Sequence, residues 1–182
     1  MKKIIALIVV CIMMFSFTGC EKKDDGNTLD VFYLNIDATA TVPEKYELKS
    51  SDESVDKQVD ELLDKLSSKP DDSKLRKTIP DDVEIRKHEE NAYSCTIDFS
   101  KSYYDMTAAE EVLMRASVVR TLTQLKQITY VMFTVDKAPL MNSDGEIIGS
   151  MNADDFVEKN FLEKVYRRAM ESDADIVQFD YV

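Results

Sequence analysis

The stretch TAAEEVLMRASVVRTLTQLKQITYVMFTV, residues 107–135, decides the fold class. Its larger part is predicted to be a helix over 107–125, because apolar residues recur at helical spacing along one stripe: Ala109, Val112, Leu113, Ala116, Val119, Leu122 and Leu125. Thr107 and Glu110 have the spacing of a capping box at its start. Residues 128–135 are apolar on both faces, which is typical of a central strand. The stretch therefore predicts a helix that leads into the middle of a sheet.

A hairpin is predicted just before this helix. In the strand 83–87, Val83 and Ile85 alternate with charged residues, and Glu89-Glu90-Asn91 is predicted to be the turn. The returning strand, 92–99, carries four side chains that we expect on one buried face: Tyr93, Cys95, Ile97 and Phe99. This hairpin would supply two more strands to the sheet.

The first strand and the first helix lie further upstream. Residues 29–36 (LDVFYLNI) are rich in β-branched and aromatic residues and are predicted to be a strand. A polar stretch follows to Asp52, with a short strand around 46–49 as a further option. A helix is then expected from Ser54, capped by Asp52 or Ser54 and ending before Pro70, with one apolar face: Val55, Val59, Leu62, Leu63 and Leu66.

The resulting order is strand, helix, strand, strand, helix, strand, the split β-α-β-β-α-β arrangement of an α+β domain, with both helices on one face of one sheet. Beyond it, Asn142-Ser143-Asp144-Gly145 predicts a hairpin turn leading to a short strand at 147–148. Residues 154–172 show helical spacing, and 176–182 form either a last strand or a docked tail. We assign 29–161 to the domain and 162–182 to a C-terminal extension of helix and strand.

The start of the chain predicts export. Lys2 and Lys3 precede an uncharged apolar run over 4–17, which as a helix would be about 21 Å long, short of the roughly 30 Å needed to span a membrane. Residues Thr18-Gly19-Cys20 then resemble the lipobox of bacterial lipoproteins, in which the cysteine sulfur receives a diacylglyceryl group and the leader is removed. We expect a signal peptide over 1–19, a lipid on Cys20 and a flexible tether over 20–28. An ordinary secretory signal is the alternative.

Charge and cysteine content exclude several classes of protein. The chain has 35 acidic against 23 basic residues and a formal net charge of −12, which disfavours nucleic acid and other anionic polymers as partners. Cys11 lies in the leader and Cys20 is expected to carry lipid, so Cys95 is left alone and no intramolecular disulfide is expected in the mature protein.

Several short motifs, taken together, resemble one family. They are Val31-Phe32-Tyr33-Leu34, Leu62-Leu63, Thr78-Ile79-Pro80, Ile97-Asp98-Phe99-Ser100 and Thr121-Leu122-Thr123-Gln124-Leu125, followed by Val131, Phe133, Val135 and Asp136. In this order and spacing, residues 29–161 resemble a GerMN domain, a module of bacterial sporulation and germination lipoproteins. The resemblance implies a non-catalytic interaction module, similar to domains that assemble envelope complexes in spore-forming bacteria.

The residues that could carry chemistry are few. His88 is the only histidine and is expected to be a solvated turn residue, and Cys95 is expected to pack in the core as a small hydrophobe. Acidic pairs are expected to be solvated: Asp71-Asp72, Asp81-Asp82 and Asp154-Asp155. Asn142, Asp144 and Glu146 lack the ligand series of a calcium loop. We therefore predict no catalytic residues, no metal and no cofactor.

Three hypotheses for function follow. The favoured one is a lipid-anchored scaffold on the extracytoplasmic face of the cell membrane that binds envelope proteins, with self-association as a further option. The second is a lipoprotein that binds a cell-wall fragment or a small solute. The third is a hydrolase that uses carboxylates such as Asp98 and Glu110.

Overall fold

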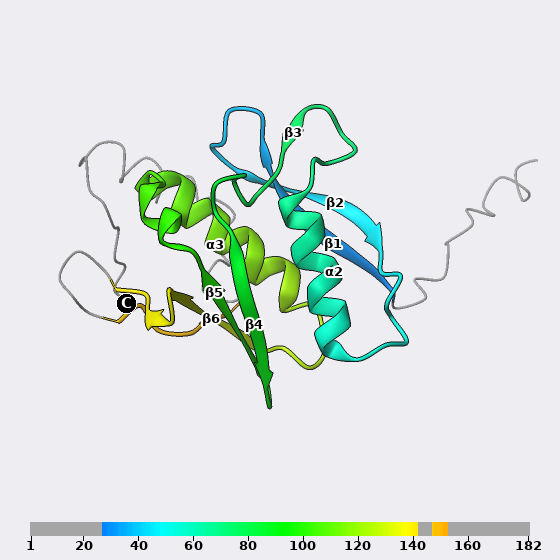
Figure 1. Cartoon of the computed structure of the whole chain (residues 1–182). Helices are drawn as coiled ribbons and strands as arrows, with labels where there is room; N and C mark the ends of the chain where they lie inside the picture. Colours follow the sequence, from blue (N-terminus) through cyan, green and yellow to red (C-terminus); the bar gives the residue numbers. More distant parts are fainter. Residues whose placement is uncertain (1–26, 142–146, 153–182) are drawn as a thin grey trace, which may run out of the picture.

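The computed structural model describes residues 27–141 and 147–152. In these ranges the strands form two sheets, with helix α3 (Ala108–Leu122) between them and helix α2 (Val55–Ser67) beside it (Figure 1). The α+β class predicted from the sequence is confirmed.

The first sheet has the order β2-β1-β3. Strand β1 (Thr28–Asn35) forms an antiparallel hairpin with β2 (Thr41–Glu47), and its last two residues pair with the short β3 (Leu75–Arg76). The middle of β1 is fully buried, whereas β2 has an alternating, half-exposed pattern. The first sheet is therefore a twisted hairpin with only one deeply buried strand.

The second sheet has the order β4-β5-β6-β7, and β8 also pairs with β6. Strands β4 (Ile85–Asn91) and β5 (Ser94–Phe99) form an antiparallel hairpin; β6 (Tyr130–Val135) runs parallel to β5 and returns to it through α3. The short strands β7 (Ala138–Pro139) and β8 (Met151–Asn152) are both antiparallel to β6. Strand β6 is thus central, as predicted. Its side chains alternate, however, between buried and partly exposed positions.

Helix α3 is buried on nearly every side because it packs against β1, β2, β6 and α2. Its start has the predicted capping box: the Thr107 hydroxyl accepts from the Glu110 N–H, and the Glu110 carboxylate accepts from the Thr107 N–H. A short 3-10 helix, η1 (Lys101–Asp105), precedes it. There Tyr103 donates to the buried Glu111 at 2.8 Å, and Glu111 forms an ion pair with Arg115 at 3.3 Å, so the Glu111 carboxylate has two partners inside the protein.

The edge of β1 that lies opposite β2, called its outer edge below, is covered by side chains. The Asp30 N–H donates to Gln124 Oε1 at 2.9 Å, and Gln124 Nε2 donates to the Asp30 carbonyl at 2.7 Å. Two residues further along β1, the Phe32 N–H donates to Thr121 Oγ1 at 3.1 Å and the Phe32 carbonyl accepts from Thr78 Oγ1 at 2.8 Å. An amide and two hydroxyls thus take the place of a neighbouring strand.

This edge corrects the expectation of one continuous sheet. Strand β1 pairs with β2 and β3 rather than with the strands that follow α2, because α3 lies along β1 and occupies the edge that a joined sheet would need. The β2 strand is also longer than the option at 46–49, and runs over 41–47.

The turn of the second hairpin was predicted wrongly. Glu89, Glu90 and Asn91 belong to β4, and the turn consists of Ala92, with φ of 54°, and Tyr93. Tyr93 is consequently 67% exposed, not part of the core face that Cys95, Ile97 and Phe99 do form. The charged residues suggested a turn, but β4 is an edge strand, where charge is well tolerated.

Residues of the predicted 142–145 turn, the 154–172 helix and the 176–182 segment lie outside the described residues. Of the predicted 147–148 strand, Ile147 forms a single bridge with Met141.

Candidate functional site

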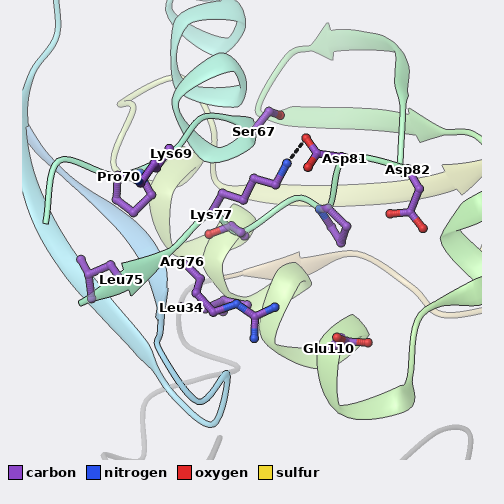
Figure 2. Close-up of a pocket in the computed structure, with 12 residues that line it drawn as sticks. Leu34, Ser67, Lys69, Pro70, Leu75, Arg76, Lys77, Asp81, Asp82 and Glu110 are labelled. Carbon is purple, nitrogen blue, oxygen red and sulfur yellow. Dashed lines mark ion pairs between the residues drawn. The ribbon is translucent and has the colours of Figure 1, made fainter. Parts of the chain in front are cut away.

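A cavity of about 750 Å³ opens between the end of β1, the segment that contains β3 and the start of α3 (Figure 2). Its apolar lining comes from Leu34, Pro70, Leu75 and Pro80. Because the loop after α2 is held by backbone bonds from Thr78 and Ile79 to the Leu66 carbonyl, this wall of the cavity is fixed to the helix end.

Charges of both signs surround this cavity. Lys69, Arg76 and Lys77 contribute the cations, and Asp81, Asp82 and Glu110 contribute the carboxylates. Lys77 forms an ion pair with the exposed Asp81 (Figure 2), and Glu110 is already bound by the helix cap. Among the described residues no carboxylate forms an ion pair with the Arg76 guanidinium, so the cavity suits a ligand with an anionic group better than a cationic one.

A second cluster of polar side chains joins α2 to β4. His88 Nε2 lies 2.8 Å from Asp60 Oδ1, and His88 Nδ1 lies 2.7 Å from Glu90 Oε1. The His88 side chain is only 12% exposed, which corrects the expectation of a solvated turn residue. The reason is tertiary: Asp60 reaches His88 from α2, 28 positions earlier in the chain.

These carboxylates determine the protonation of the histidine. Burial lowers the pKa of His88, but the hydrogen bonds and charges of Asp60 and Glu90 outweigh it and raise that pKa above its ordinary value. The pKa of Asp60 is lowered mainly by its hydrogen bond to His88. The imidazole, whose protonated form both carboxylates favour, therefore links the helix to the strand.

The carboxylates proposed for hydrolysis do not come together. Asp98 accepts hydrogen bonds from Thr134 Oγ1 and the Lys137 N–H, both at 2.7 Å, and lines a cavity of about 440 Å³ on the outer face of the second sheet. Glu110 lines the other cavity. The two groups lack the shared cleft that a pair of catalytic carboxylates requires.

Cys95 is in the core, as predicted, and is completely buried. Burial, with the nearby Glu90 charge, raises the pKa of its thiol to about 12. Because only the thiolate is a good nucleophile, Cys95 is inert at neutral pH.

The remaining candidates are exposed or outside the described residues. Asp71, Asp72, Asp81 and Asp82 are all exposed, as predicted. Cys20, residues 142–146 and the pair Asp154-Asp155 lie outside. Sequence reasoning missed Asp56 and Asp60, which lie one helical turn apart on α2; nothing in a single acidic sequence distinguishes this pair from its many solvated carboxylates.

These features define an α+β domain whose described residues contain no assembled catalytic set. The chain belongs to the Germane family, described as "Sporulation and spore germination", whose model matches residues 30–141. The resemblance stated from the motifs is thereby confirmed. No curated protein matches the chain.

Two solved structures share the fold. The first GerMN domain of the sporulation protein GerM from Bacillus subtilis matches with a TM-score of 0.52 and 18% identity, over 67% of this chain and 93% of that one. The tandem GerMN domains of GerM match with a TM-score of 0.53 and 17% identity, over 70% of this chain and 46% of that one. Among the described residues, no helix has both the length and the apolarity to cross a membrane.

Proposed function

We propose that this protein is a lipid-anchored, extracytoplasmic interaction protein that serves sporulation or germination and has no catalytic activity of its own. The observation that carries the proposal is membership of the Germane family over residues 30–141. Family membership supports the sporulation or germination context; the anchor and the scaffold role are our inference from the residues.

The anchor is inferred from the start of the chain. The apolar run over 4–17 is followed by Thr18-Gly19-Cys20 and then at once by charged residues. Two or more acyl chains hold a protein stably on a membrane, at about 0.8 kcal/mol per buried methylene. Cys20 is therefore the residue on which the proposed location depends.

The interaction role is supported by the outer edge of β4. Among residues 27–141 and 147–152, no strand pairs with this edge. Exposed edges are places where another chain can add a strand, and side chains then provide specificity. The exposed charges along β4 are of both signs, with Arg86 and Lys87 towards one end and Glu89 towards the other, so a partner must match this pattern.

Lipidation is tested by mass spectrometry of the protein purified from membranes of its own host or a related Gram-positive bacterium. We expect the wild type to begin at Cys20 and to carry acyl chains, and Cys20→Ala to keep its leader or leave the membrane fraction. A mature wild-type protein with a free Cys20 thiol would contradict the anchor.

The cellular role is tested by deleting the gene and counting heat-resistant spores and germinated spores. We expect one of the two counts to fall, with recovery by the wild-type gene and weaker recovery by Cys20→Ala. Normal counts in the deletion strain would contradict the sporulation or germination role.

The interaction surface is tested by placing a photo-cross-linking amino acid at Glu89 on the β4 edge, with Lys74, an exposed residue beside β3, as the matched control. We expect a membrane protein to be cross-linked from position 89 and not from position 74. Equal cross-linking from both positions would count against a specific edge interaction.

The cavity in Figure 2 supports a second candidate function, which is the binding of a cell-wall fragment or a small solute. Its apolar wall and the Arg76 guanidinium suit a peptide fragment with a free carboxylate. In a thermal-shift titration with muropeptides, Arg76→Ala should reduce the response while Lys74→Ala, outside the cavity, keeps it. No shift of the wild type at any muropeptide concentration would exclude this candidate.

A further inference from the structure

We propose that Asp56, His88 and Glu90 form a binding site for a divalent metal ion of the zinc type. The site shares strand β4 with the proposed interaction edge but lies on the side of the strand that faces α2, away from the cavity in Figure 2. It does not rest on the proposed function.

The three side chains already converge. One potential ligand atom from each lies within 4.8 Å of the other two. Zinc ligands bind at about 2.0–2.2 Å and, in a tetrahedron, lie roughly 3.3–3.6 Å apart. His88 and Glu90 are half-buried, and their 2.7 Å contact has to open by less than about 1 Å to admit the metal. Asp56 is exposed in the first turn of α2 and can move inward to complete the site.

The fold explains this convergence. His88 and Glu90 are alternate residues of β4, so their side chains point to the same face of the sheet, the face on which α2 packs (Figure 1). Asp56 and Asp60 are four residues apart on α2 and therefore lie on one side of the helix. Each element thus presents two polar groups to the other.

Asp60 orients the histidine as a metal ligand. With Nε2–H donating to Asp60 Oδ1 at 2.8 Å, the other ring nitrogen, Nδ1, faces Glu90. Metal-bound histidines commonly donate their second ring N–H to a carboxylate, which fixes the tautomer and the orientation of the ring. In this site Asp60 would be that carboxylate, and the metal would take the place of the hydrogen between His88 Nδ1 and Glu90.

Charge favours a divalent cation. Asp56, Asp60 and Glu90 bring three negative charges, and Lys57, 3.2 Å from Asp60, compensates one of them. One imidazole nitrogen with two carboxylates suits zinc better than magnesium, which prefers oxygen ligands alone. Water would complete the coordination.

The test is isothermal titration of the full chain in detergent with Zn²⁺ alone, and with Mg²⁺ for comparison, together with the visible absorption of the Co²⁺ form. We expect one Zn²⁺ per chain and an intense Co²⁺ spectrum of the tetrahedral kind. Asp56→Asn and His88→Gln should each lower the affinity at least tenfold, and Asp60→Asn about tenfold, as an orienting carboxylate does.

Glu89→Gln is the matched control, since it removes a carboxylate from the same strand outside the ligand set, and it should bind Zn²⁺ as the wild type does. Circular dichroism of each variant checks the fold; if His88→Gln unfolds, the exposed Asp56→Asn decides. No stoichiometric Zn²⁺ binding, equal binding of Mg²⁺, or an equal loss in Glu89→Gln would overturn the site.

Discussion

The outer edges of β1 and β4 are closed in different ways. Along β1, the backbone groups of Asp30 and Phe32 are all bound by side chains of Gln124, Thr121 and Thr78. Along β4, no strand of the described residues covers the edge, and its exposed side chains are charged except for Asn91. The first edge is closed by hydrogen bonds made within the domain; the second is protected only by charge.

This difference indicates which edge can serve function. A strand added to β1 would first have to displace the buried Thr78 and Thr121 and the partly buried Gln124, and break their hydrogen bonds. A strand added to β4 needs only matching charge. The comparison therefore predicts that substitutions at the β1 edge alter stability, whereas substitutions at the β4 edge alter binding.

The largest effect is expected from Thr121→Val combined with Gln124→Leu. Both changes keep an apolar body of similar size but leave the Phe32 N–H and the Asp30 backbone groups without partners. A buried unsatisfied group such as the Phe32 N–H costs about 1–3 kcal/mol, and the partly buried Asp30 groups cost less, so we expect a loss of about 3 kcal/mol for the pair. Urea denaturation followed by circular dichroism measures it.

Thr123→Val is the matched control for that pair, because the Thr123 hydroxyl bonds only the Val119 carbonyl of its own helix. We expect a change below about 1 kcal/mol. A control as destabilised as the double variant would show that removing a hydroxyl from this end of α3, rather than opening the β1 edge, causes the loss.

Thr78→Val should have the next largest effect. Its buried hydroxyl donates to the Phe32 carbonyl, and an isosteric valine removes only this bond. A carbonyl left without a donor leads us to expect a loss of about 2 kcal/mol in the same urea experiment. An unchanged midpoint would mean that the strand edge is held by Thr121 and Gln124 alone.

Glu61→Gln tests how the opposite side of the first sheet, at the end of β2, is held to α2. Glu61 accepts hydrogen bonds from Tyr46 Oη, the Lys49 N–H and the Ser50 N–H, at 2.6–2.9 Å, and so ties α2 to the end of β2. Burial raises its pKa, but these bonds prevail and lower the pKa of Glu61 from 4.5 to about 2.

Because the pKa of Glu61 is lower in the folded protein than in the unfolded chain, the ionised carboxylate stabilises the fold at any pH above about 4.5. This stabilisation is lost as pH falls from about 4.5, the unfolded-state pKa, towards about 2, the folded-state pKa. We expect Glu61→Gln to lose about 1 kcal/mol at pH 7 and to show a smaller further loss between pH 5 and pH 3 than the wild type. Parallel pH dependences of the two proteins would contradict this assignment.

The smallest effect on stability is expected at β4. Glu89 pairs with Lys87, and both side chains are about two-thirds exposed, at 64% and 66%. Glu89→Ala should leave the urea midpoint unchanged within error, because exposed ion pairs contribute little. The same variant should weaken partner capture at the β4 edge, which separates a binding role from a structural one.

Local patterns predicted the elements well. The apolar stripe of α2, the Thr107–Glu110 capping box and the buried face of Cys95, Ile97 and Phe99 all follow from the spacing of neighbouring residues, and the structure contains each of them. The turn was misplaced by a few residues because charged residues tolerate both a turn and an edge strand. The motif Thr121-Leu122-Thr123-Gln124-Leu125 gives no sign that its polar side chains bind the backbone of β1.

By itself, then, the sequence determined the α+β class, the capping box of α3 and the apolar faces of α2 and of Cys95, Ile97 and Phe99, since these depend on interactions over a few residues. It did not determine the α2 cap, because Ser54 makes no side-chain cap hydrogen bond. Tertiary structure alone decided that the strands divide into two sheets, that Gln124 binds Asp30 across 94 positions and that His88 lies between Asp60 and Glu90. The physical reason is that a hydrogen-bonding side chain could bind many groups of the same chemistry along the chain. Only the packing of distant segments selects which of them it binds.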